Sequence, residues 1–403
     1  MAVSLLTREV SDLCLGKPAL RSLSISATVA DALSALKRSD EPYLSIWSCD
    51  HNNNNLPNFN INIKTRGLRC NEENCRCIGK ICMVDIVCFL CKEDNLKNLG
   101  KVLQTCVAVL VPKVSGDVVK HLEPHARLSE AIDLIVEGAQ NLVIPLHSPF
   151  TREKLTHKTS SISTLHNGRE YCWLTLEDLI RYLLNCIGLF SPIPNHSIES
   201  LNIIEAESIL AVCYDEPTTS ALPLIAQSLV KQTSVAVVDT EGKLIGEISP
   251  YALNYCDESV AAAVATLSVG ELMAFVDCGD PPEDLIKLVK ERLDEKNLGA
   301  ALELIEEESG ISMSSSCSSY SSSSDEEFGL SKSGSFRCHS TRVARRTDAI
   351  VCFPWSSLVA VMIQAISHRV SYVWVVEEDG TLVGIVTFTG MMKVFRERLK
   401  SMM

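Results

Sequence analysis

The chain has 403 residues, of which 46% are hydrophobic, and a formal net charge of −13 with a pI near 5.2. The hydrophobic share is enough for real cores, and the length suggests two or three ordinary domains. The acidic balance excludes sequence-independent binding to nucleic acid, which needs a basic stripe of lysines and arginines. We expect no membrane span either. The most apolar stretch, residues 259–276, carries Glu271 and predicts a buried helix.

The N-terminal residues and the cysteines indicate a cytoplasmic protein, with the nucleus as a further location. The sequence MAVSLLTREVSDL lacks a basic start followed by an apolar core, and it carries Glu9 and Asp12 early. The 17 cysteines are an odd number and are scattered through apolar segments, which is typical of a reducing compartment. We therefore expect no disulfides.

In chain order, the first half predicts two modules of helix, strand, strand and helix, each interrupted between its strands. In the first module, residues 28–47 supply the helix and first strand, and CIGKICMVDIVCFL (77–90) supplies the second strand and following helix. In the second, residues 127–147 and 171–184 repeat that order. The predicted boundaries are 1–95 and 96–194, with loop insertions at 49–76 and 148–169.

The second half predicts two more modules, which match each other without gaps. VAVVDTEGKLIGEIS (235–249) and VWVVEEDGTLVGIVT (373–387) each predict a strand, a turn ending in glycine and a second strand. A segment of helical periodicity precedes each copy. Self-similarity of this kind indicates repeated modules, and the predicted boundaries are 195–266 and 347–403.

The segment between these two modules, residues 267–346, has two parts. The first contains PPEDLIKLVKERLDEKNLGAALELIEEE and predicts an amphipathic helix, either a partner-binding helix or a lid on the folded body. The second is serine-rich and cannot bury enough apolar surface to order itself, which predicts a disordered linker. Its serines lie near acids and arginines, so they are candidate phosphorylation sites, with a plain solvated loop as the alternative.

The four modules resemble the CBS domain (cystathionine-beta-synthase domain), because their second strands follow the form Gly-h-h-(Thr/Ser). The two matching hairpins, the segment HRVS (368–371) and CWLTLEDL in the second module carry the resemblance. The set of four is similar to the gamma subunits of SNF1- and AMP-activated protein kinases, and within that group to plant CBSX-type proteins. The resemblance implies an α/β fold of α+β repeats, with four CBS domains paired into two Bateman modules that form a flat disc.

The resemblance also implies adenosine-containing ligands, commonly AMP, ADP, ATP or S-adenosylmethionine, bound in clefts between paired repeats. The family motif is Gly-h-h-(Thr/Ser)-x-x-(Asp/Asn). Its carboxylate accepts hydrogen bonds from ribose hydroxyls, and the helix N-terminus offers N–H groups to phosphate. The second module matches best, with Thr175 and Asp178, although Cys172 stands where the glycine is expected.

The other three modules depart from the motif. The first keeps Gly79 and Asp85 but has Cys82 in place of the hydroxyl; the third has Gly246 and Ser249 with Ala252 at the acid position; the fourth has Gly384 and Thr387 with Gly390 at the acid position. Losing a charged acceptor removes about 1.5 to 3 kcal/mol of binding free energy. We therefore expect at most two working sites.

Several of these residues have a second interpretation. Family members often place a basic pair ahead of the first strand, which His368 and Arg369 match, and Lys231 holds the arginine position in the third module. Cations at the C-terminal end of a helix can also be purely structural. In the same way, Thr175 and Asp178 could act only as a capping box that starts their helix.

The sequence predicts neither a metal site nor an enzyme. Six cysteines fall close together, but their spacings do not reproduce the paired Cys-x-x-Cys ribbons of structural zinc sites. They are Cys70, Cys75, Cys77, Cys82, Cys88 and Cys91. The chain contains no Walker loop, nucleophile elbow, His-Glu-x-x-His motif or kinase triad.

The resulting hypothesis is a non-catalytic regulatory or adaptor protein that senses an adenosine-containing ligand and acts on a partner. The resemblance makes the catalytic or beta subunits of an SNF1-related protein kinase the expected partner, and the chain could also form a homodimer. Two alternatives stay open. One is a CBS scaffold that no longer binds ligand, and the other is a redox regulator that acts through its thiols on thioredoxin-type partners.

Overall fold

The computed structural model describes residues 8–39, 41–49, 75–111, 119–146, 165–166, 168–207, 209–277, 281–302, 305 and 347–402. The strands of these residues form four three-stranded sheets, one in each predicted module. In every sheet the first strand runs parallel to the second, and the second pairs antiparallel with the third. The predicted α/β class and the four repeats are confirmed.

The first two modules share one order of elements. Module 1 contains β1 (Ser22–Ser24), α2 (Val29–Lys37), β2 (Tyr43–Trp47), β3 (Cys77–Cys82) and α3 (Met83–Leu90). Module 2 contains β4 (Val119–His121), α6 (Leu128–Val136), β5 (Asn141–Pro145), β6 (Tyr171–Thr175) and α7 (Leu176–Asn185). The connection between them includes α4 (Glu93–Leu96) and α5 (Leu99–Leu103).

The last two modules repeat this order. Module 3 contains β7 (Ala211–Cys213), α8 (Thr218–Lys231), β8 (Val235–Val238), β9 (Leu244–Ile248) and α9 (Pro250–Leu253). Module 4 contains β10 (Val351–Cys352), α14 (Leu358–His368), β11 (Tyr372–Val376), β12 (Leu382–Thr387) and α15 (Phe388–Ser401). The connection between them includes α10 (Val260–Thr266), α11 (Val269–Asp277) and α12 (Glu283–Glu295).

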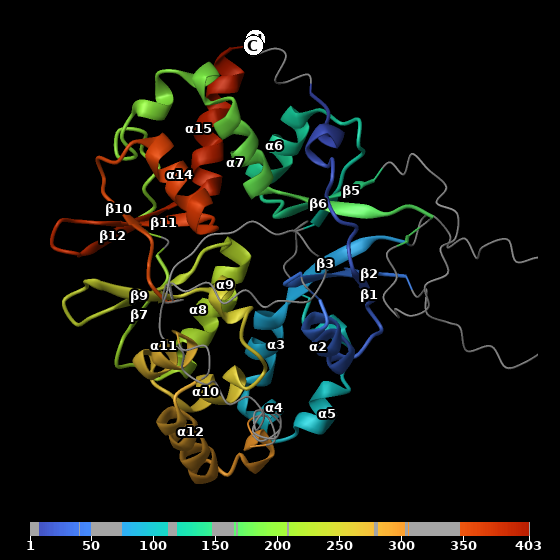
Figure 1. Cartoon of the computed structure of the whole chain (residues 1–403), viewed down its shortest axis with the longest axis vertical. Coiled ribbons are helices and arrows are strands. Elements are labelled where there is room, and N and C mark those ends of the chain that lie inside the picture. The colour runs from blue at the N-terminus through green and yellow to red at the C-terminus, as the bar shows by residue number, and fades with distance from the viewer. Residues whose placement is uncertain are drawn as a thin grey trace, which may run out of the picture.

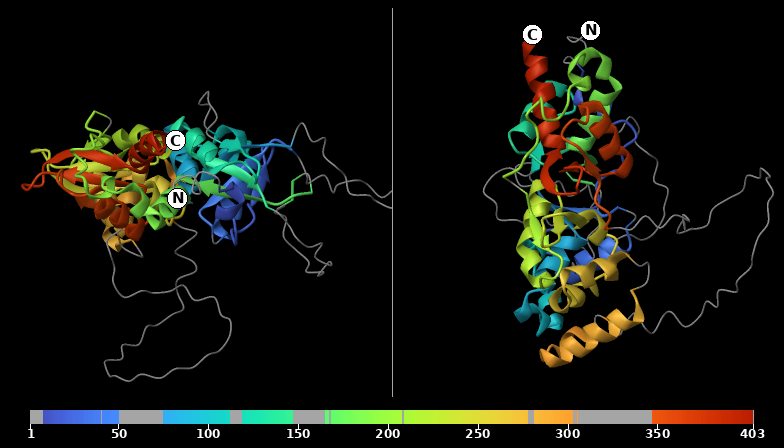
Figure 2. Two further views of the ribbon diagram at one scale, coloured as in Figure 1. Left: turned by 90° about the horizontal axis from the view of Figure 1, so that it is seen from above. Right: turned by 90° about the vertical axis from the view of Figure 1, so that its left-hand side faces the viewer.

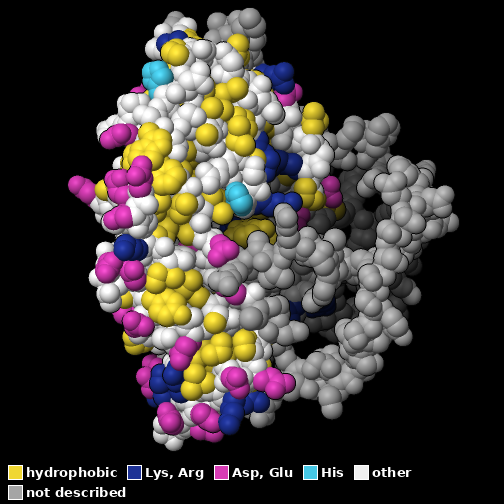
Figure 3. Space-filling view, turned by 60° about the vertical axis from the view of Figure 1, so that its left-hand side comes forward, with side chains coloured by type: hydrophobic (Ala, Val, Ile, Leu, Met, Phe, Trp, Pro, Cys, Tyr) yellow, Lys and Arg dark blue, Asp and Glu magenta, His cyan; other side chains and the backbone are white. Residues whose placement is uncertain are grey.

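The two gap-free hairpins form as predicted, and their turns pair with each other. Gly242 and Gly380 adopt φ angles of 82° and 87°, which favour glycine. The amide of Leu244 donates to the carbonyl of Gly380 at 3.0 Å, and the amide of Leu382 donates to that of Gly242 at 3.1 Å. Exposed acidic residues surround these turns, and acidic side chains gather along this edge in Figure 3. This edge therefore adds to the negative surface that the net charge predicts.

The modules pack as two pairs into a flat disc (Figures 1 and 2). Modules 1 and 2 meet through a cluster of buried side chains on their sheets that includes Trp47 and Tyr171, and modules 3 and 4 through one that includes Tyr372 and Trp374. The helices then join the pairs: those of module 1 share a core with module 3, and those of module 2 share a core with module 4. The paired disc implied by the resemblance is confirmed.

The predicted buried helix over 259–276 is in fact two helices. The chain is extended at Leu267, and α11 begins with a new cap in which the Ser268 hydroxyl accepts from the Glu271 amide at 3.3 Å. The Glu271 carboxylate in turn accepts from the Ser268 amide at 2.7 Å. Periodicity alone missed this break, because the capping residues lie inside a continuous apolar run. Among the described residues, no helix has both the length and the apolar character needed to cross a membrane.

The amphipathic segment after α11 packs against module 3. Its helix α12 buries Val289 and Leu293, contacts α10, and lies at one end of the disc (Figure 1). Arg292 holds it there by pairing with Glu271 at 2.7 Å and donating to the carbonyl of Thr266 at 3.0 Å. The apolar face of α12 therefore packs against the chain itself, as the predicted lid on the folded body would. The serine-rich segment and its predicted phosphorylation sites lie outside the described residues.

Candidate ligand-binding cleft between modules 1 and 2

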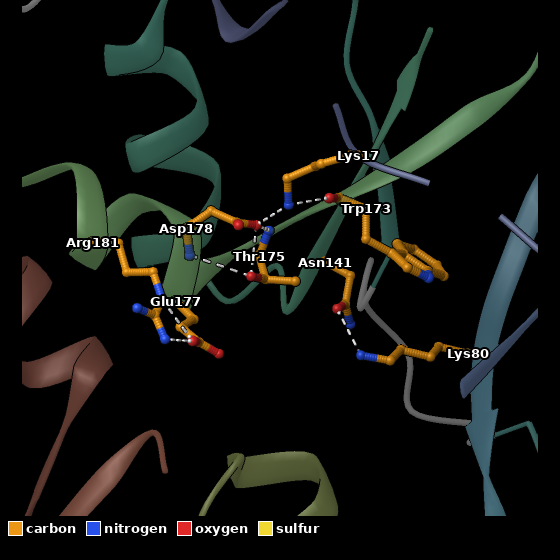
Figure 4. A network of polar contacts seen from close by, with 8 residues as sticks. All are labelled: Lys17, Lys80, Asn141, Trp173, Thr175, Glu177, Asp178 and Arg181. Carbon is orange, nitrogen blue, oxygen red and sulfur yellow. Dashed lines mark hydrogen bonds and ion pairs between the residues drawn. The ribbon is translucent and has the colours of Figure 1, made fainter. Parts of the chain in front are cut away.

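Thr175 and Asp178 lie together at the point where β6 ends and α7 begins (Figure 4). The Asp178 carboxylate accepts from the Thr175 amide and from the Thr175 hydroxyl, both at 2.7 Å, through its Oδ2 atom. The predicted capping box is present. Asp178 Oδ1 receives no hydrogen bond from any described residue, so a second carboxylate oxygen stays available at the helix N-terminus.

Lys17 supplies a cation to the same carboxylate from a distant part of the chain. Its Nζ lies 2.5 Å from Asp178 Oδ2 and donates to the backbone carbonyl of Trp173 at 2.9 Å. Both side chains of the ion pair are about one-fifth to one-quarter exposed. Sequence reasoning missed Lys17, because the segment before β1 carries no motif that would place it next to Asp178 of module 2.

Lys80 approaches Asn141 of module 2 from module 1. It lies on β3, and its Nζ donates to Asn141 Oδ1 at 3.2 Å and lies 3.6 Å from the centre of the Tyr43 ring. Asn141 pairs with Thr175 in the sheet of module 2, so Lys80 lies near the capping box. Burial lowers the pKa of Lys80 to about 8, which leaves it mostly charged at neutral pH. This residue too was missed.

The second predicted acid, Asp85, belongs to module 1. It accepts from the Cys82 amide at 2.8 Å and caps α3, and burial raises its pKa to about 6. Cys82 supplies a thiol where the motif has a hydroxyl, and burial raises the pKa of that thiol well above its ordinary value. The amide of Val84 already donates to Asn254 of module 3 at 3.3 Å. This half of the cleft therefore offers fewer free donors than the half at Thr175.

The cavity beside the predicted Ser249 site of module 3 is small. Ser249 caps α9, and the cavity beside it has a volume of about 10 Å³, enough for one water. Ala252, Met273 and Thr347 are among its lining residues. The Thr347 carbonyl accepts from the Glu247 amide at 2.8 Å, so the chain itself covers this position. The predicted role of Ser249 in ligand binding stays a prediction.

The predicted Thr387 site of module 4 is covered in a similar way. The Thr387 hydroxyl caps α15 and donates to Glu205 Oε1 at 3.3 Å, and the backbone of Glu205 exchanges hydrogen bonds with Ile385. A Cβ atom at Gly390, the expected acid position, would lie 3.7 Å from the same Glu205 oxygen. An acid is thus present, but it comes from the linker before module 3 and binds Thr387 itself.

The interface between modules 3 and 4 also carries the opposite charge. Glu247 follows Gly246 in β9 as Lys80 follows Gly79 in β3, so the two residues hold equivalent positions. The Glu247 carboxylate is buried and accepts from the Tyr372 hydroxyl at 2.8 Å and from Trp374 Nε1 at 2.6 Å. Burial raises its pKa to about 7. The two interfaces therefore carry side chains of opposite charge at this equivalent position, Lys80 in one and Glu247 in the other.

The three predicted cations lie at the C-terminal ends of α8 and α14. Lys231 is exposed at the end of α8, and its neighbours Val230 and Gln232 both hydrogen-bond Gln140, the residue before Asn141. Lys231 therefore lies near the start of β5 in module 2. His368 and Arg369 are exposed at the end of α14 and form no ion pair with the described part of the chain. Their predicted contact with phosphate stays a prediction.

Three of the buried thiols do not have the acidity that redox chemistry needs. Burial raises the pKa of Cys77, Cys88 and Cys352 to about 12, which keeps them as thiols at neutral pH. A thiol reacts as its thiolate, so these three are poor nucleophiles. The redox alternative gains no support from them.

Four like modules packed as two pairs, each with a capped helix at the end of its third strand, define a four-repeat CBS architecture. The chain belongs to the CBS domain-containing proteins. The CBS domain family matches residues 346–397, and the chain is 45% identical to CBS domain-containing protein CBSX5 of Arabidopsis thaliana over 411 residues, covering 100% of both. The resemblance inferred from the motifs is thus confirmed.

Two more distant relatives span most of the chain. SNF1-related protein kinase regulatory subunit gamma-like PV42b of Arabidopsis thaliana is 22% identical over 325 residues, covering 80% of this chain and 77% of that protein. Among solved structures, protein MJ1225 of Methanocaldococcus jannaschii, described as a proposed archaeal homologue of g-AMPK, aligns with a TM-score of 0.53 and 14% identity. The alignment covers 96% of this chain and 100% of that one, and it supports the fold alone.

Proposed function

We propose that this protein is a non-catalytic regulator that binds one adenosine-containing ligand between modules 1 and 2. The observation that carries the proposal is the capping box of α7. Its Asp178 keeps Oδ1 free of donors from the described residues, directly beside the amides of a helix N-terminus. A carboxylate oxygen in that position can accept from a ribose hydroxyl, while the helix end and nearby lysines meet a phosphate.

The charge around the cleft favours a phosphate-bearing ligand such as AMP, ADP or ATP. Lys17 and Lys80 lie near the capping box, and Lys231 lies near the start of β5. Cations within a few ångströms attract phosphate and repel the positive sulfonium of S-adenosylmethionine. Among the ligands that the family resemblance implies, adenine nucleotides therefore fit this cleft best.

The proposed partner is a protein kinase of the SNF1-related type. The support is the similarity to a relative that is named as a gamma-like regulatory subunit of such a kinase. A ligand would act by binding one packing of the disc more tightly than another, since equal affinity shifts nothing. Copurification of the chain with the kinase catalytic subunit, with and without AMP, tests this step. If the kinase subunit copurifies under neither condition, the proposed kinase partner is wrong.

A ligand-independent scaffold is the second candidate, and the closed interface of modules 3 and 4 favours it. There the chain covers both hydroxyl positions, with Thr347 over Ser249 and Glu205 over Thr387. The disc could then serve protein contacts alone. The two candidates make opposite predictions about whether the purified protein binds any nucleotide.

We expect calorimetric titration to show AMP binding to the wild-type protein and a ten- to hundred-fold weaker affinity in Asp178→Ala. The variant removes a charged acceptor worth about 1.5 to 3 kcal/mol. Asp31→Ala is the matched control, because Thr28 and Asp31 form the same capping box at 2.7 to 3.1 Å on α2, away from the cleft. Both variants lose a cap, but only Asp178→Ala should lose affinity. No heat from AMP, ATP or S-adenosylmethionine with the wild type would favour the scaffold.

We also expect AMP binding to take up a proton near pH 8. The pKa of Lys80 is about 8 in the free protein, and a nearby phosphate stabilises the charged amine and raises that pKa. Uptake should approach about half a proton per ligand at pH 8 and fall towards zero at pH 6.5. Titrations in buffers of different ionisation enthalpy measure it. Lys80→Met should abolish the uptake and weaken binding, whereas Lys97→Met, an exposed lysine on the connection between modules 1 and 2, should change neither.

A further inference from the structure

Three potential metal ligands meet where the two loop insertions return to the folded body. Cys49 and Cys75 lie at the two ends of the first insertion, and His166 comes from the second. The sulfurs of Cys49 and Cys75 are 3.1 Å apart, and His166 Nδ1 lies 3.3 Å and 3.5 Å from them. All three residues are buried, with exposed fractions of 9%, 7% and 2%.

The identity and spacing of these donors match zinc. Zinc binds thiolate sulfur at about 2.3 Å and imidazole nitrogen at about 2.0 to 2.1 Å, which in a tetrahedron sets sulfur and nitrogen about 3.5 Å apart. The observed sulfur–nitrogen distances of 3.3 Å and 3.5 Å are close to this value. Two sulfurs in the same tetrahedron lie about 3.8 Å apart, so Cys49 and Cys75 need to separate by less than 1 Å.

The histidine is held in the orientation that a ligand needs. Its Nε2 lies 2.8 Å from the Ser22 hydroxyl, and its ring stacks on Trp47 with a centroid distance of 3.5 Å and an angle of 6°. These contacts fix the ring so that Nδ1 faces both sulfurs. Metal-bound histidines usually have their second nitrogen anchored in this way.

We propose that Cys49, Cys75 and His166 bind a structural zinc ion that joins the two insertions to the interface of modules 1 and 2. The fourth position of the tetrahedron is left to water or to another side chain. The sequence prediction of no metal site weighed a different set of cysteines. Of those six, only Cys75 belongs to the cluster, Cys70 lies outside the described residues, and the other four are not among its ligands.

A disulfide between Cys49 and Cys75 is the competing chemistry. It would draw the sulfurs to about 2.05 Å and would require loss of two electrons and two protons to an oxidant. A disulfide also gains little from an imidazole nitrogen aimed between its two sulfurs, because disulfide sulfur is a weak acceptor. The position of His166 Nδ1 therefore favours zinc.

Metal analysis of the full-length protein tests the proposal. Protein purified without chelator should contain about one zinc ion per chain, measured by elemental mass spectrometry. Cys75→Ser and His166→Asn should each lose most of it. Cys77→Ser is the matched control, since Cys77 is equally buried in the same interface but bonds a carbonyl instead of the cluster. Cobalt substitution should give a thiolate-to-metal charge-transfer band that Cys49→Ser weakens.

A second measurement on the wild type covers the case in which the variants do not fold. Removal of zinc with a strong chelator should speed the alkylation of Cys49 and Cys75 and leave the rate of alkylation at Cys77 unchanged. Peptide mass spectrometry measures these rates. The proposal is overturned by protein that folds with no bound zinc, by zinc retained in Cys75→Ser, or by a Cys49–Cys75 disulfide in the freshly purified protein.

Discussion

The wild-type protein is expected to lose stability between pH 5 and pH 8 through Glu247, and Glu247→Gln is expected to remove that loss. The Glu247 carboxyl is buried between modules 3 and 4, where it accepts from Tyr372 and Trp374. Burial raises its pKa from 4.5 to about 7. The folded state therefore holds the Glu247 proton more tightly than the unfolded state does.

The sign of the effect follows from this difference. A carboxyl with a raised pKa in the folded state contributes its full stabilisation below pH 4.5 and loses it as the pH rises through about 7. The loss is up to about 3 kcal/mol. Thermal unfolding of both proteins at a series of pH values measures it. Glu247→Gln should melt higher than the wild type at pH 8, and the difference should shrink towards pH 5.

Glu271→Gln provides a control of opposite sign. The hydrogen bond from Arg292 holds the pKa of Glu271 below its usual value, so this group stabilises the fold at higher pH and loses that contribution on acidification. At pH 8 Glu247→Gln should therefore be more stable than the wild type and Glu271→Gln less stable, and both differences should shrink on acidification. A melting curve for Glu247→Gln that stays parallel to the wild type across pH 5 to 8 would contradict the account of this interface.

Gly246→Ala is expected to destabilise the fold by about 1 to 3 kcal/mol. A Cβ atom at this position would lie 2.7 Å from the Thr347 carbonyl oxygen and 2.5 Å from Met273 Cε. The backbone at Thr347 cannot move away without breaking its hydrogen bond with the Glu247 amide. Denaturant unfolding measures the loss, and the linker at Thr347 should become more sensitive to hydrogen exchange.

Gly100→Ala is the matched control for this substitution. Gly100 lies inside α5, and nothing would come within 4 Å of its added Cβ. Alanine is favoured over glycine in a helix, so the control should be about 0.5 to 1 kcal/mol more stable. Equal stability changes in the two variants would mean that close approach by the linker is not the reason for the glycine.

The fold was predictable from the sequence because its signals are local. The turn glycines Gly242 and Gly380 and the capping pair Thr175 and Asp178 lie within a few residues of the elements that they define. The repeat of one pattern then fixed the four-module architecture. Where two helices ran together, as around Ser268, the local signal was too weak to show the break.

The cleft could be predicted only in part, because most of its polar residues come from distant segments. Lys17 and Asp178 are 161 positions apart, and Lys80 and Asn141 are 61 positions apart. The sequence also gave no sign that linkers cross between modules. Thr347, in the segment before β10, lies against Gly246 of module 3. Glu205, in the segment before β7, lies against Gly384 of module 4. These crossings bring Thr347 next to Ser249 and Glu205 next to Thr387.

A crystal structure of the protein grown with AMP would show whether the nucleotide binds between modules 1 and 2. We expect one AMP per chain, with a ribose hydroxyl at hydrogen-bonding distance from Asp178 Oδ1 and the phosphate facing Lys17 and Lys80. AMP bound beside Ser249 or Thr387, or an empty cleft between modules 1 and 2 at saturating AMP, would contradict it.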